Sequence, residues 1–196
     1  MRHTSPESSS CFPQNDNLSP LQQGSGKRIR PRNRNRYHQR LLSHDWTTKM
    51  TPQDFFNTAV TLLLEQGRPS LKRGRFPNCM YRGPRNLKCA IGMFIPDEEY
   101  KKNPVEDAGV STIVLHNEYP TITKLAETVP EKLMTAMQCA HDGGLSFTQP
   151  NGEHKDFETC WRPAAQTTTK NQWVADFKQR ARMVGEAWNL DTSVIS

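Results

Sequence analysis

The sequence predicts a small α+β domain in which three main helices pack on a short antiparallel sheet centred on a hairpin. Three segments with a single apolar helical face, and two short apolar runs separated by a turn sequence, are the observations behind this prediction. At 196 residues the chain is long enough for one domain with a hydrophobic core and short for two. We expect this domain to comprise residues 50–196 and to follow a disordered basic tail of residues 1–49.

The first predicted helix runs from Pro52 to Gln66. Thr51 is a suitable N-cap, a proline at the first helical position costs no hydrogen bond, and Asp54 lies near the positive end of the helix dipole. Gly67 supplies the left-handed residue that commonly ends a helix. The apolar residues on one face of this helix are Phe55, Phe56, Ala59, Val60 and Leu63.

A hairpin is predicted after this helix. The apolar runs 79–82 and 87–91 flank Gly83-Pro84-Arg85-Asn86, whose residue types favour a tight turn. An alternative in which Cys89 opens a short helix stays open, because periodicity does not decide over so few residues. The acids that follow Pro96 mark the beginning of a short helix, and the segment Val110–Leu115 is apolar but of undetermined type.

Two further helices are predicted near the end of the sequence. Thr128-Val129-Pro130-Glu131 has the pattern of a capping box, and Gly143 ends the helix that follows it. Thr169 caps a last helix with one apolar face, and residues 145–168 form a polar loop long enough to be either functional or disordered. The predicted core consists of Phe55, Phe56, Leu63, Ile91, Leu133, Met137, Trp173, Phe177 and Trp188.

Composition limits the classes of function. The first 50 residues hold nine Lys and Arg against three Asp and Glu, so this segment carries the whole formal net charge of +6. No apolar run approaches the roughly 20 residues of a membrane span, and no secretion signal is present at the start. Five cysteines at irregular spacing do not indicate a disulfide framework. We therefore expect a soluble cytoplasmic protein without a membrane partner.

Two basic clusters are candidates for binding nucleic acid. In the tail, alternating arginines beside a tyrosine can neutralise phosphates and stack on a base, although a solvated extension explains them equally well. A second cluster flanks the predicted hairpin, where charges also serve to prevent strands from aggregating. The candidate residues are Arg28, Arg30, Arg32, Arg34, Arg36 and Tyr37 in the tail, and Arg73, Arg75, Arg82, Arg85 and Lys88 near the hairpin.

A set of motifs follows the first helix: Tyr81-Arg82-Gly83-Pro84, Leu87-Lys88-Cys89-Ala90-Ile91-Gly92 and Ile95-Pro96-Asp97-Glu98-Glu99-Tyr100. With a later helix that ends in His141-Asp142 and a last helix containing tryptophan, this pattern resembles a set of short uncharacterised proteins of tailed phages and prophages. The resemblance covers most of residues 50–190, although residues 143–168 are longer than the usual pattern. It implies a viral accessory protein that acts in the cytoplasm of a bacterial host.

Cys89, His141 and Asp142 are the residue types that a Cys-His nucleophilic mechanism uses, with an imidazole that activates the thiol and a carboxylate that orients the ring. The alternative is a buried Cys89 and a polar helix end that caps carbonyl groups. Adjacent helical residues point about 100° apart, so Asp142 is expected to be poorly placed to orient His141. The structural interpretation is therefore preferred for these three residues.

A zinc site made of Cys79, Cys89, Cys139 and His141 is a weaker alternative, because the sequence lacks the short Cys-x2-4-Cys spacing of such sites. We expect neither a metal nor a cofactor, since no phosphate-binding or dinucleotide-binding motif is present.

These observations together favour a non-enzymatic phage or prophage accessory protein that binds a host or viral macromolecule. A nucleic-acid-binding protein and a Cys-His hydrolase are the alternatives. Met50 directly precedes the first predicted helix, so translation from Met50 instead of Met1 also stays open.

Overall fold

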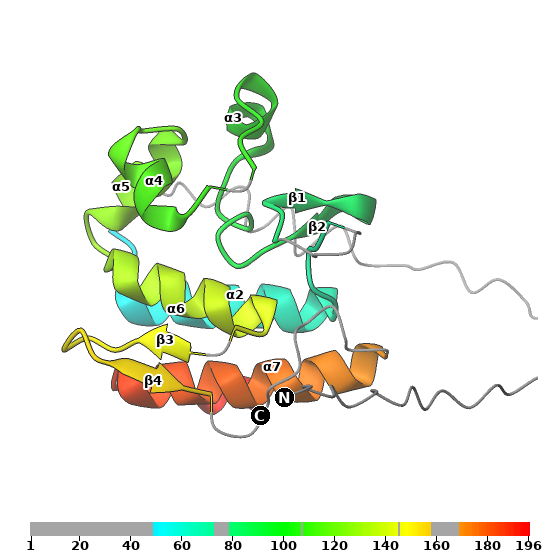
Figure 1. The fold of residues 1–196 in the computed structure, drawn as a ribbon, viewed down its shortest axis with the longest axis vertical. Helices are drawn as coiled ribbons and strands as arrows, with labels where there is room; N and C mark the ends of the chain where they lie inside the picture. Colours follow the sequence, from blue (N-terminus) through cyan, green and yellow to red (C-terminus); the bar gives the residue numbers. More distant parts are fainter. Residues whose placement is uncertain (1–48, 73–78, 107, 145, 158–168) are drawn as a thin grey trace, which may run out of the picture.

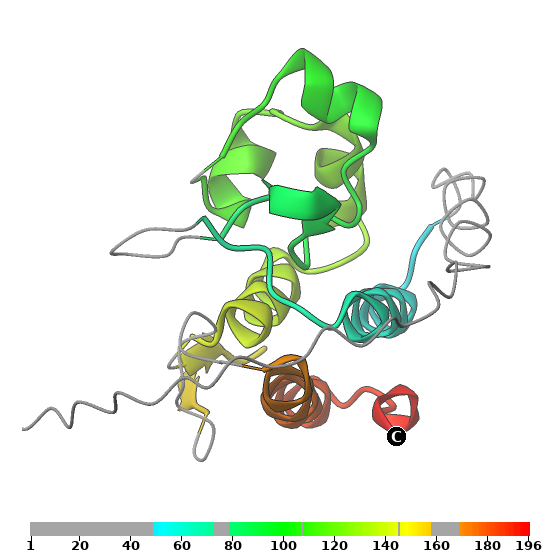
Figure 2. The ribbon, with the colours of Figure 1, turned by 90° about the vertical axis from the view of Figure 1, so that its right-hand side faces the viewer.

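The computed structural model describes residues 49–72, 79–106, 108–144, 146–157 and 169–196. Three long helices, α2 (Pro52–Gln66), α6 (Glu131–Asp142) and α7 (Lys170–Ala187), pack against one another as a bundle, with α7 below α2 and α6 (Figures 1 and 2). A short 3-10 helix, η3 (Ser193–Ile195), packs against α2 and α7 near the end of the chain. The buried faces of the three long helices supply much of the core.

The predicted bounds of α2 are confirmed because both of its ends have strong local signals. The Thr51 side chain accepts a hydrogen bond from the Asp54 N–H, and the Asp54 carboxylate accepts one from the Thr51 N–H. At the other end, Gly67 adopts the left-handed conformation with φ 63°. Thr169 caps α7 in the predicted way by accepting from the Gln172 N–H.

The capping box predicted at Thr128 is wrong. The N-cap of α6 is Pro130, which has no side-chain cap. The N–H groups of Thr128 and Val129 bond to Leu125 O, so these residues continue the turn that closes the preceding helix. Thr128 therefore belongs to that turn and does not cap α6.

The predicted hairpin is present. Strands β1 (Arg82–Gly83) and β2 (Leu87–Lys88) pair antiparallel, with Arg82 opposite Lys88, and the 3-10 turn η1 (Pro84–Asn86) joins them. The residues after β2 form turns rather than the helix kept as an alternative. Gly92 lies in these turns, so close to Tyr81 that an added Cβ would meet Tyr81 O at 2.2 Å.

Three short helices form an upper lobe beside this hairpin (Figures 1 and 2): α3 (Asp97–Lys102), α4 (Val110–Leu115) and α5 (Pro120–Ala126). The acids after Pro96 begin α3 as predicted. The segment of undetermined type is the helix α4, whose Val110 and Ile113 are buried.

A second hairpin replaces part of the loop predicted over residues 145–168. Strand β3 (Ser146–Thr148) pairs antiparallel with β4 (His154–Asp156) beside α6, and the buried rings of Phe147 and Phe157 lie 4.9 Å apart. Strands of three residues are too short to show alternation among polar neighbours, which explains why the sequence did not reveal them. The rest of that segment, residues 158–168, lies outside the described residues.

The α+β, helix-rich class is confirmed, and eight of the nine predicted core residues are buried. Trp188, the ninth, is only partly buried at the end of α7. Among the residues that the structure describes, no helix is both long and apolar enough to cross a membrane.

Candidate functional site

A polar cluster lies where the end of α6 meets the segment that leads into the first hairpin. His141, in the last turn of α6, has no exposed surface. Opposite it, Ser70 O accepts from the Met80 N–H, and the next residue, Leu71, forms a β-bridge with Cys79. This pairing brings residues 70 and 79 together against the end of α6.

Both ring nitrogens of His141 are engaged within the protein. Nε2 lies 3.1 Å from the Ser70 backbone nitrogen, whose N–H donates to it. Nδ1 lies 2.6 Å from Asp142 Oδ1. Since Nε2 accepts a hydrogen bond, the proton of the neutral ring belongs on Nδ1, which donates to the carboxylate.

The expectation that Asp142 is poorly placed to orient His141 is therefore wrong. Asp142 is the last residue of α6 and its carboxylate also accepts from Gln138 Nε2, one turn earlier, at 3.1 and 2.9 Å. This second hydrogen bond holds the carboxylate on the side of α6 that faces the ring. At a helix end a short side chain can reach the ring of the preceding residue, although the two side chains leave the helix about 100° apart.

Cys89 is fully buried, as expected, and its sulfur accepts a hydrogen bond from the Gly92 N–H at 3.2 Å. The cysteine that the structure brings to His141 and Asp142 is instead Cys79. One ligand atom from each of these three residues lies within 4.8 Å of the other two, the one such group among the described residues. Cys79 is distant in sequence from α6, and it was paired with His141 only in the weaker zinc alternative.

Gln138 connects the members of the cluster. Its Nε2 donates to Cys79 Sγ at 2.5 Å as well as to both oxygens of Asp142. Its Oε1 accepts from the Ile91 N–H at 3.3 Å. Gln138 was not among the predicted site residues, although its spacing of four from Asp142 places both on one helical face.

The surroundings of Cys79 and Cys139 keep these two thiols protonated at neutral pH. A hydrogen bond with Cys89, then burial, and then the charges of Cys89 and Asp142 raise the pKa of Cys79 far above its ordinary value. Burial, followed by the charge of Asp142, raises the pKa of Cys139 to about 11. Because the thiolate is the nucleophilic form, neither group is activated.

Two of the candidate cations near the hairpin are used inside the domain. The Arg82 guanidinium donates to Ile95 O, Gly92 O and Asp97, and it lies over the Tyr100 ring. The Lys88 ammonium lies 3.1 Å from Asp97. The side chains of Arg82 and Lys88 are only 13% and 9% exposed, so they stabilise the fold and present little charge to a phosphate.

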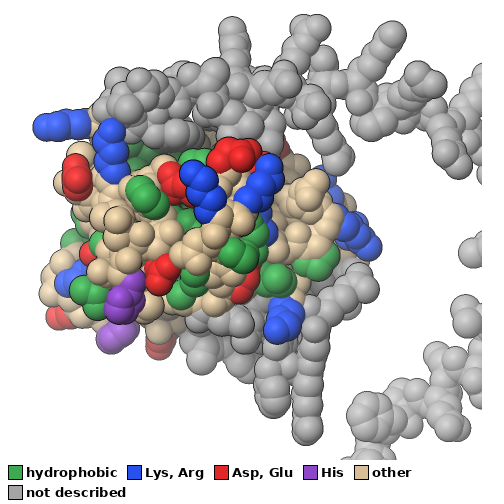
Figure 3. Space-filling model, turned by 90° about the horizontal axis from the view of Figure 1, so that it is seen from above, with side chains coloured by type: hydrophobic (Ala, Val, Ile, Leu, Met, Phe, Trp, Pro, Cys, Tyr) green, Lys and Arg blue, Asp and Glu red, His purple; other side chains and the backbone are tan. Residues whose placement is uncertain are grey.

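One further nucleic-acid candidate lies among the described residues. Arg85 is exposed at the tip of the hairpin. On the described part of the face seen from above, cationic and anionic side chains are interspersed instead of forming one basic patch (Figure 3). The tail candidates Arg28, Arg30, Arg32, Arg34, Arg36 and Tyr37, and also Arg73 and Arg75, lie outside the described residues.

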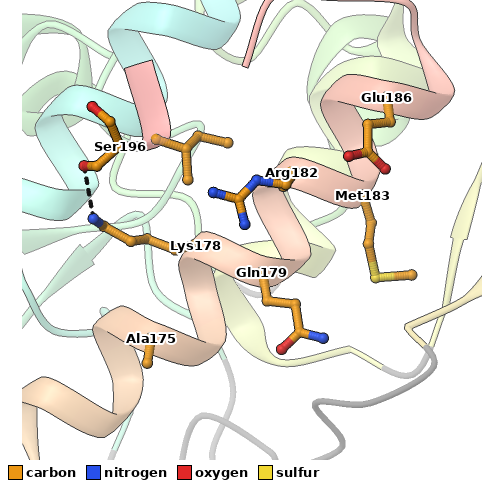
Figure 4. A pocket seen from close by; sticks show the side chains of 8 residues that line it. Ala175, Lys178, Gln179, Arg182, Met183, Glu186 and Ser196 are labelled. Atoms are coloured by element: carbon orange, nitrogen blue, oxygen red, sulfur yellow. Dashed lines mark hydrogen bonds between the residues drawn. The ribbon is translucent and has the colours of Figure 1, made fainter. Parts of the chain in front are cut away.

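An open hollow lies along the outer face of α7, beside the end of the chain. Figure 4 shows Lys178, Arg182 and Glu186 around it, and the Lys178 ammonium donates to Ser196 O at 2.8 Å. The hollow mixes both signs of charge with the apolar side chains of Met183 and Ile195. Nothing in this arrangement selects one class of ligand.

Comparison of the chain with protein-family models, with curated proteins and with solved structures found no match.

Proposed function

We propose that this protein is a non-enzymatic accessory protein of a tailed phage or prophage, which binds a host or viral macromolecule in the bacterial cytoplasm. The observation that carries the proposal is the closed hydrogen bonding of His141, whose two nitrogens are engaged by Ser70 and Asp142.

A Cys-His enzyme needs an imidazole nitrogen that can accept the proton of the thiol. Here the accepting nitrogen, Nε2, already receives the Ser70 N–H, and the other nitrogen carries a proton directed at Asp142. Cys89 is fully buried beside Gly92, and the neighbouring Cys79 is held as a thiol. This geometry favours a structural role for the cluster over the hydrolase alternative.

The residues behind the resemblance to phage proteins also have structural partners. Arg82 binds two carbonyl groups and Asp97, and a Cβ on Gly92 would overlap Tyr81 O. His141 joins α6 to the segment at Ser70. A motif whose members hold the fold together fits a family that shares a scaffold and presents variable surfaces to its partners.

The experiment is the capture of partners by the tagged full-length chain from phage-infected bacteria, with and without nuclease. The proposal predicts a protein partner that is captured equally after nuclease treatment and that stays bound at raised salt. The Cys89→Ala variant, assayed below its own unfolding midpoint, should capture the same partner. Loss of capture with Cys89→Ala, together with a covalent change in the partner, would contradict the proposal and support the hydrolase.

A nucleic-acid-binding role is the second candidate, because the arginines of the tail are independent of the closed cluster. If Arg28, Arg30, Arg32, Arg34 and Arg36 each contact a phosphate, the logarithm of the binding constant for duplex DNA should fall with log salt at a slope of about −4 to −5. The matched comparison is the chain without residues 1–49. Equal DNA binding by that shorter chain would remove the tail from the interface.

A further inference from the structure

The turn that joins β3 to β4 contains Asn151-Gly152, the one Asn-Gly pair in the sequence. Both residues are exposed. The Gly152 N–H donates to Gln149 O at 3.0 Å, which closes a β-turn with Pro150 and Asn151 as its central residues. Gly152 follows with φ 91°, a backbone conformation that glycine adopts without steric cost. The geometry of the turn therefore accounts for the glycine, and it leaves the Asn151 side chain in solvent.

The side chain of Asn151 folds back over the peptide group of Gly152. Its Oδ1 accepts a hydrogen bond from the Glu153 N–H, two residues further on, at 3.0 Å. A donor at this oxygen stabilises the negative charge that would develop there if a nucleophile attacked Cγ. The nearest nucleophile is the backbone nitrogen of Gly152, which no neighbouring Cβ obstructs. Asn151 is thus arranged for attack by its own backbone.

Two charges of opposite sign flank this peptide group. Lys132, exposed in the first turn of α6, has its ammonium so close that a Cβ built on Gly152 would lie 3.5 Å from Nζ. Attack requires the Gly152 nitrogen to lose its proton, and a nearby cation favours the resulting anion. The Glu153 carboxylate accepts from Asn151 Nδ2 at 2.9 Å, and its negative charge acts in the opposite sense. Because all these groups are exposed, solvent and salt limit the effect of each charge.

We propose that Asn151 is a site of non-enzymatic deamidation in the folded protein, promoted by Lys132 and restrained by Glu153. The Gly152 nitrogen forms a bond to Asn151 Cγ, the bond from Cγ to Nδ2 breaks, and ammonia leaves with the proton that the Gly152 nitrogen gives up. Water then opens the cyclic imide. Addition of water at Cγ gives aspartate, and addition at the main-chain carbonyl carbon gives isoaspartate.

The isoaspartate product changes the turn itself. It routes the main chain through Cβ and lengthens the turn by one carbon atom. The hydrogen bonds from the Gly152 N–H to Gln149 O and from the Gln149 N–H to Glu153 O, at 3.0 and 2.8 Å, depend on the present length. Deamidation should therefore loosen the hairpin of β3 and β4 beside α6, and the Gln149 amide proton should exchange faster with solvent.

The test is incubation of the full-length chain at neutral and mildly alkaline pH, followed by tryptic digestion and mass spectrometry, with an unincubated sample as the baseline. The tryptic peptide of residues 133–155 contains Asn151 and no other asparagine. The proposal predicts that both products accumulate at Asn151, faster as the pH rises. Conversion at the exposed Asn117 and Asn189, which precede larger residues than glycine, should be severalfold slower. Equal conversion at the three asparagines, or none at Asn151, would overturn the proposal.

Charge variants test the roles of the two flanking residues. Lys132→Gln should slow the conversion of Asn151 severalfold, and Glu153→Ala, which keeps the backbone donor, should speed it severalfold. Lys101→Gln, an exposed change on α3 in the upper lobe, should leave the rate unchanged. In concentrated urea the wild type and Lys132→Gln should convert at the same rate, because the approach of Lys132 depends on the fold. A wild-type rate in folded Lys132→Gln and Glu153→Ala, or equal slowing by Lys101→Gln, would contradict the proposal.

Discussion

Gln66 and Lys88 exchange two hydrogen bonds: the Gln66 side-chain amide donates to Lys88 O at 2.9 Å, and Gln66 Oε1 accepts from the Lys88 N–H at 2.8 Å. The side chain of α2 thereby takes the place of a neighbouring strand along the outer edge of β2. On the other edge, the Glu106 carboxylate accepts from the N–H groups of Tyr81 and Arg82. Both edges of this short hairpin are thus satisfied by side chains, which prevents pairing with another strand.

Replacement of Gln66 by alanine should lower the free energy of unfolding by about 1–3 kcal/mol, because two partly buried backbone groups lose their partner. The measurement is urea unfolding followed by circular dichroism. Gln53→Ala is the matched control, since Gln53 makes the same two-bond exchange with Asp191 at an exposed position. An equal loss in the two variants would show that the edge of β2 gains nothing special from Gln66.

Replacement of Gly92 by alanine should destabilise the protein by about 3 kcal/mol, because a Cβ there would overlap the Tyr81 carbonyl oxygen. Gly109→Ala provides the comparison, since a Cβ at Gly109 has no neighbour within 4 Å. The midpoints of urea unfolding should separate clearly, with Gly109→Ala near the wild type. A Gly92→Ala variant as stable as the wild type would show that the turn after β2 does not lie as close to Tyr81 as the structure places it.

Asp97 should make the stability depend on pH at the acidic end. Burial raises the pKa of Asp97, but hydrogen bonds and the charges of Lys88 and Arg82 outweigh it and hold the pKa below the ordinary value. Burial and the charge of Arg82 lower the pKa of Lys88, although the hydrogen bond and charge of Asp97 act to raise it. Asp97 therefore only partly offsets the effect of burial on the Lys88 ammonium.

A carboxyl group with a lowered pKa stabilises the folded state above its unfolded pKa, and this contribution is lost as the pH falls through the folded pKa. Asp97→Asn should therefore lower stability by about 0.5–1 kcal/mol at pH 7, and the difference should vanish well below pH 4. Thermal unfolding from pH 2.5 to pH 7 measures it. Glu98→Gln, which removes an exposed pair with Lys101, should show no such trend.

Alanine variants of Arg82 and Arg85 should distinguish an effect on stability from an effect on the binding of nucleic acid. Arg82→Ala removes the hydrogen bonds to Gly92, Ile95 and Asp97 and should cost about 3 kcal/mol in unfolding free energy. Arg85→Ala, at the exposed tip, should leave stability unchanged and weaken binding only if the hairpin contacts phosphates. Thermal unfolding measures the stability of each variant, and DNA titration measures its binding. Similar unfolding midpoints for Arg82→Ala and Arg85→Ala would contradict the structural role of Arg82.

The sequence predicted those parts of the structure whose causes are local. Thr51 and Gly67 fix the ends of α2 through neighbours within four residues, and the turn chemistry of Gly83 to Asn86 produces the first hairpin. The prediction at Thr128 was wrong because the turn that ends α5 continues through this residue. That turn and the capping-box pattern are two local signals that compete for the same residue.

The polar cluster could be predicted only in part. His141 and Asp142 stood out as residue types, but their partner Ser70 lies 71 positions away and Cys79 reaches the cluster through a single β-bridge. Such contacts depend on how α6 packs against the hairpin. Packing between distant segments leaves no periodic pattern of residues in the sequence. Arg82 and Lys88 show the same limit, since basic residues beside a hairpin look alike whether they face solvent or an internal carboxylate.

The position of the proton on the His141 ring decides whether the polar cluster is structural, and long-range proton–nitrogen NMR of the labelled full-length protein measures it at neutral pH. The structure predicts a neutral ring with its proton on Nδ1, where it is hydrogen-bonded to Asp142. It also predicts that the Ser70 amide proton, which is donated to Nε2, exchanges slowly with solvent. A ring with its proton on Nε2 and a rapidly exchanging Ser70 amide would contradict it, because Nδ1 would then be able to accept the proton of a thiol.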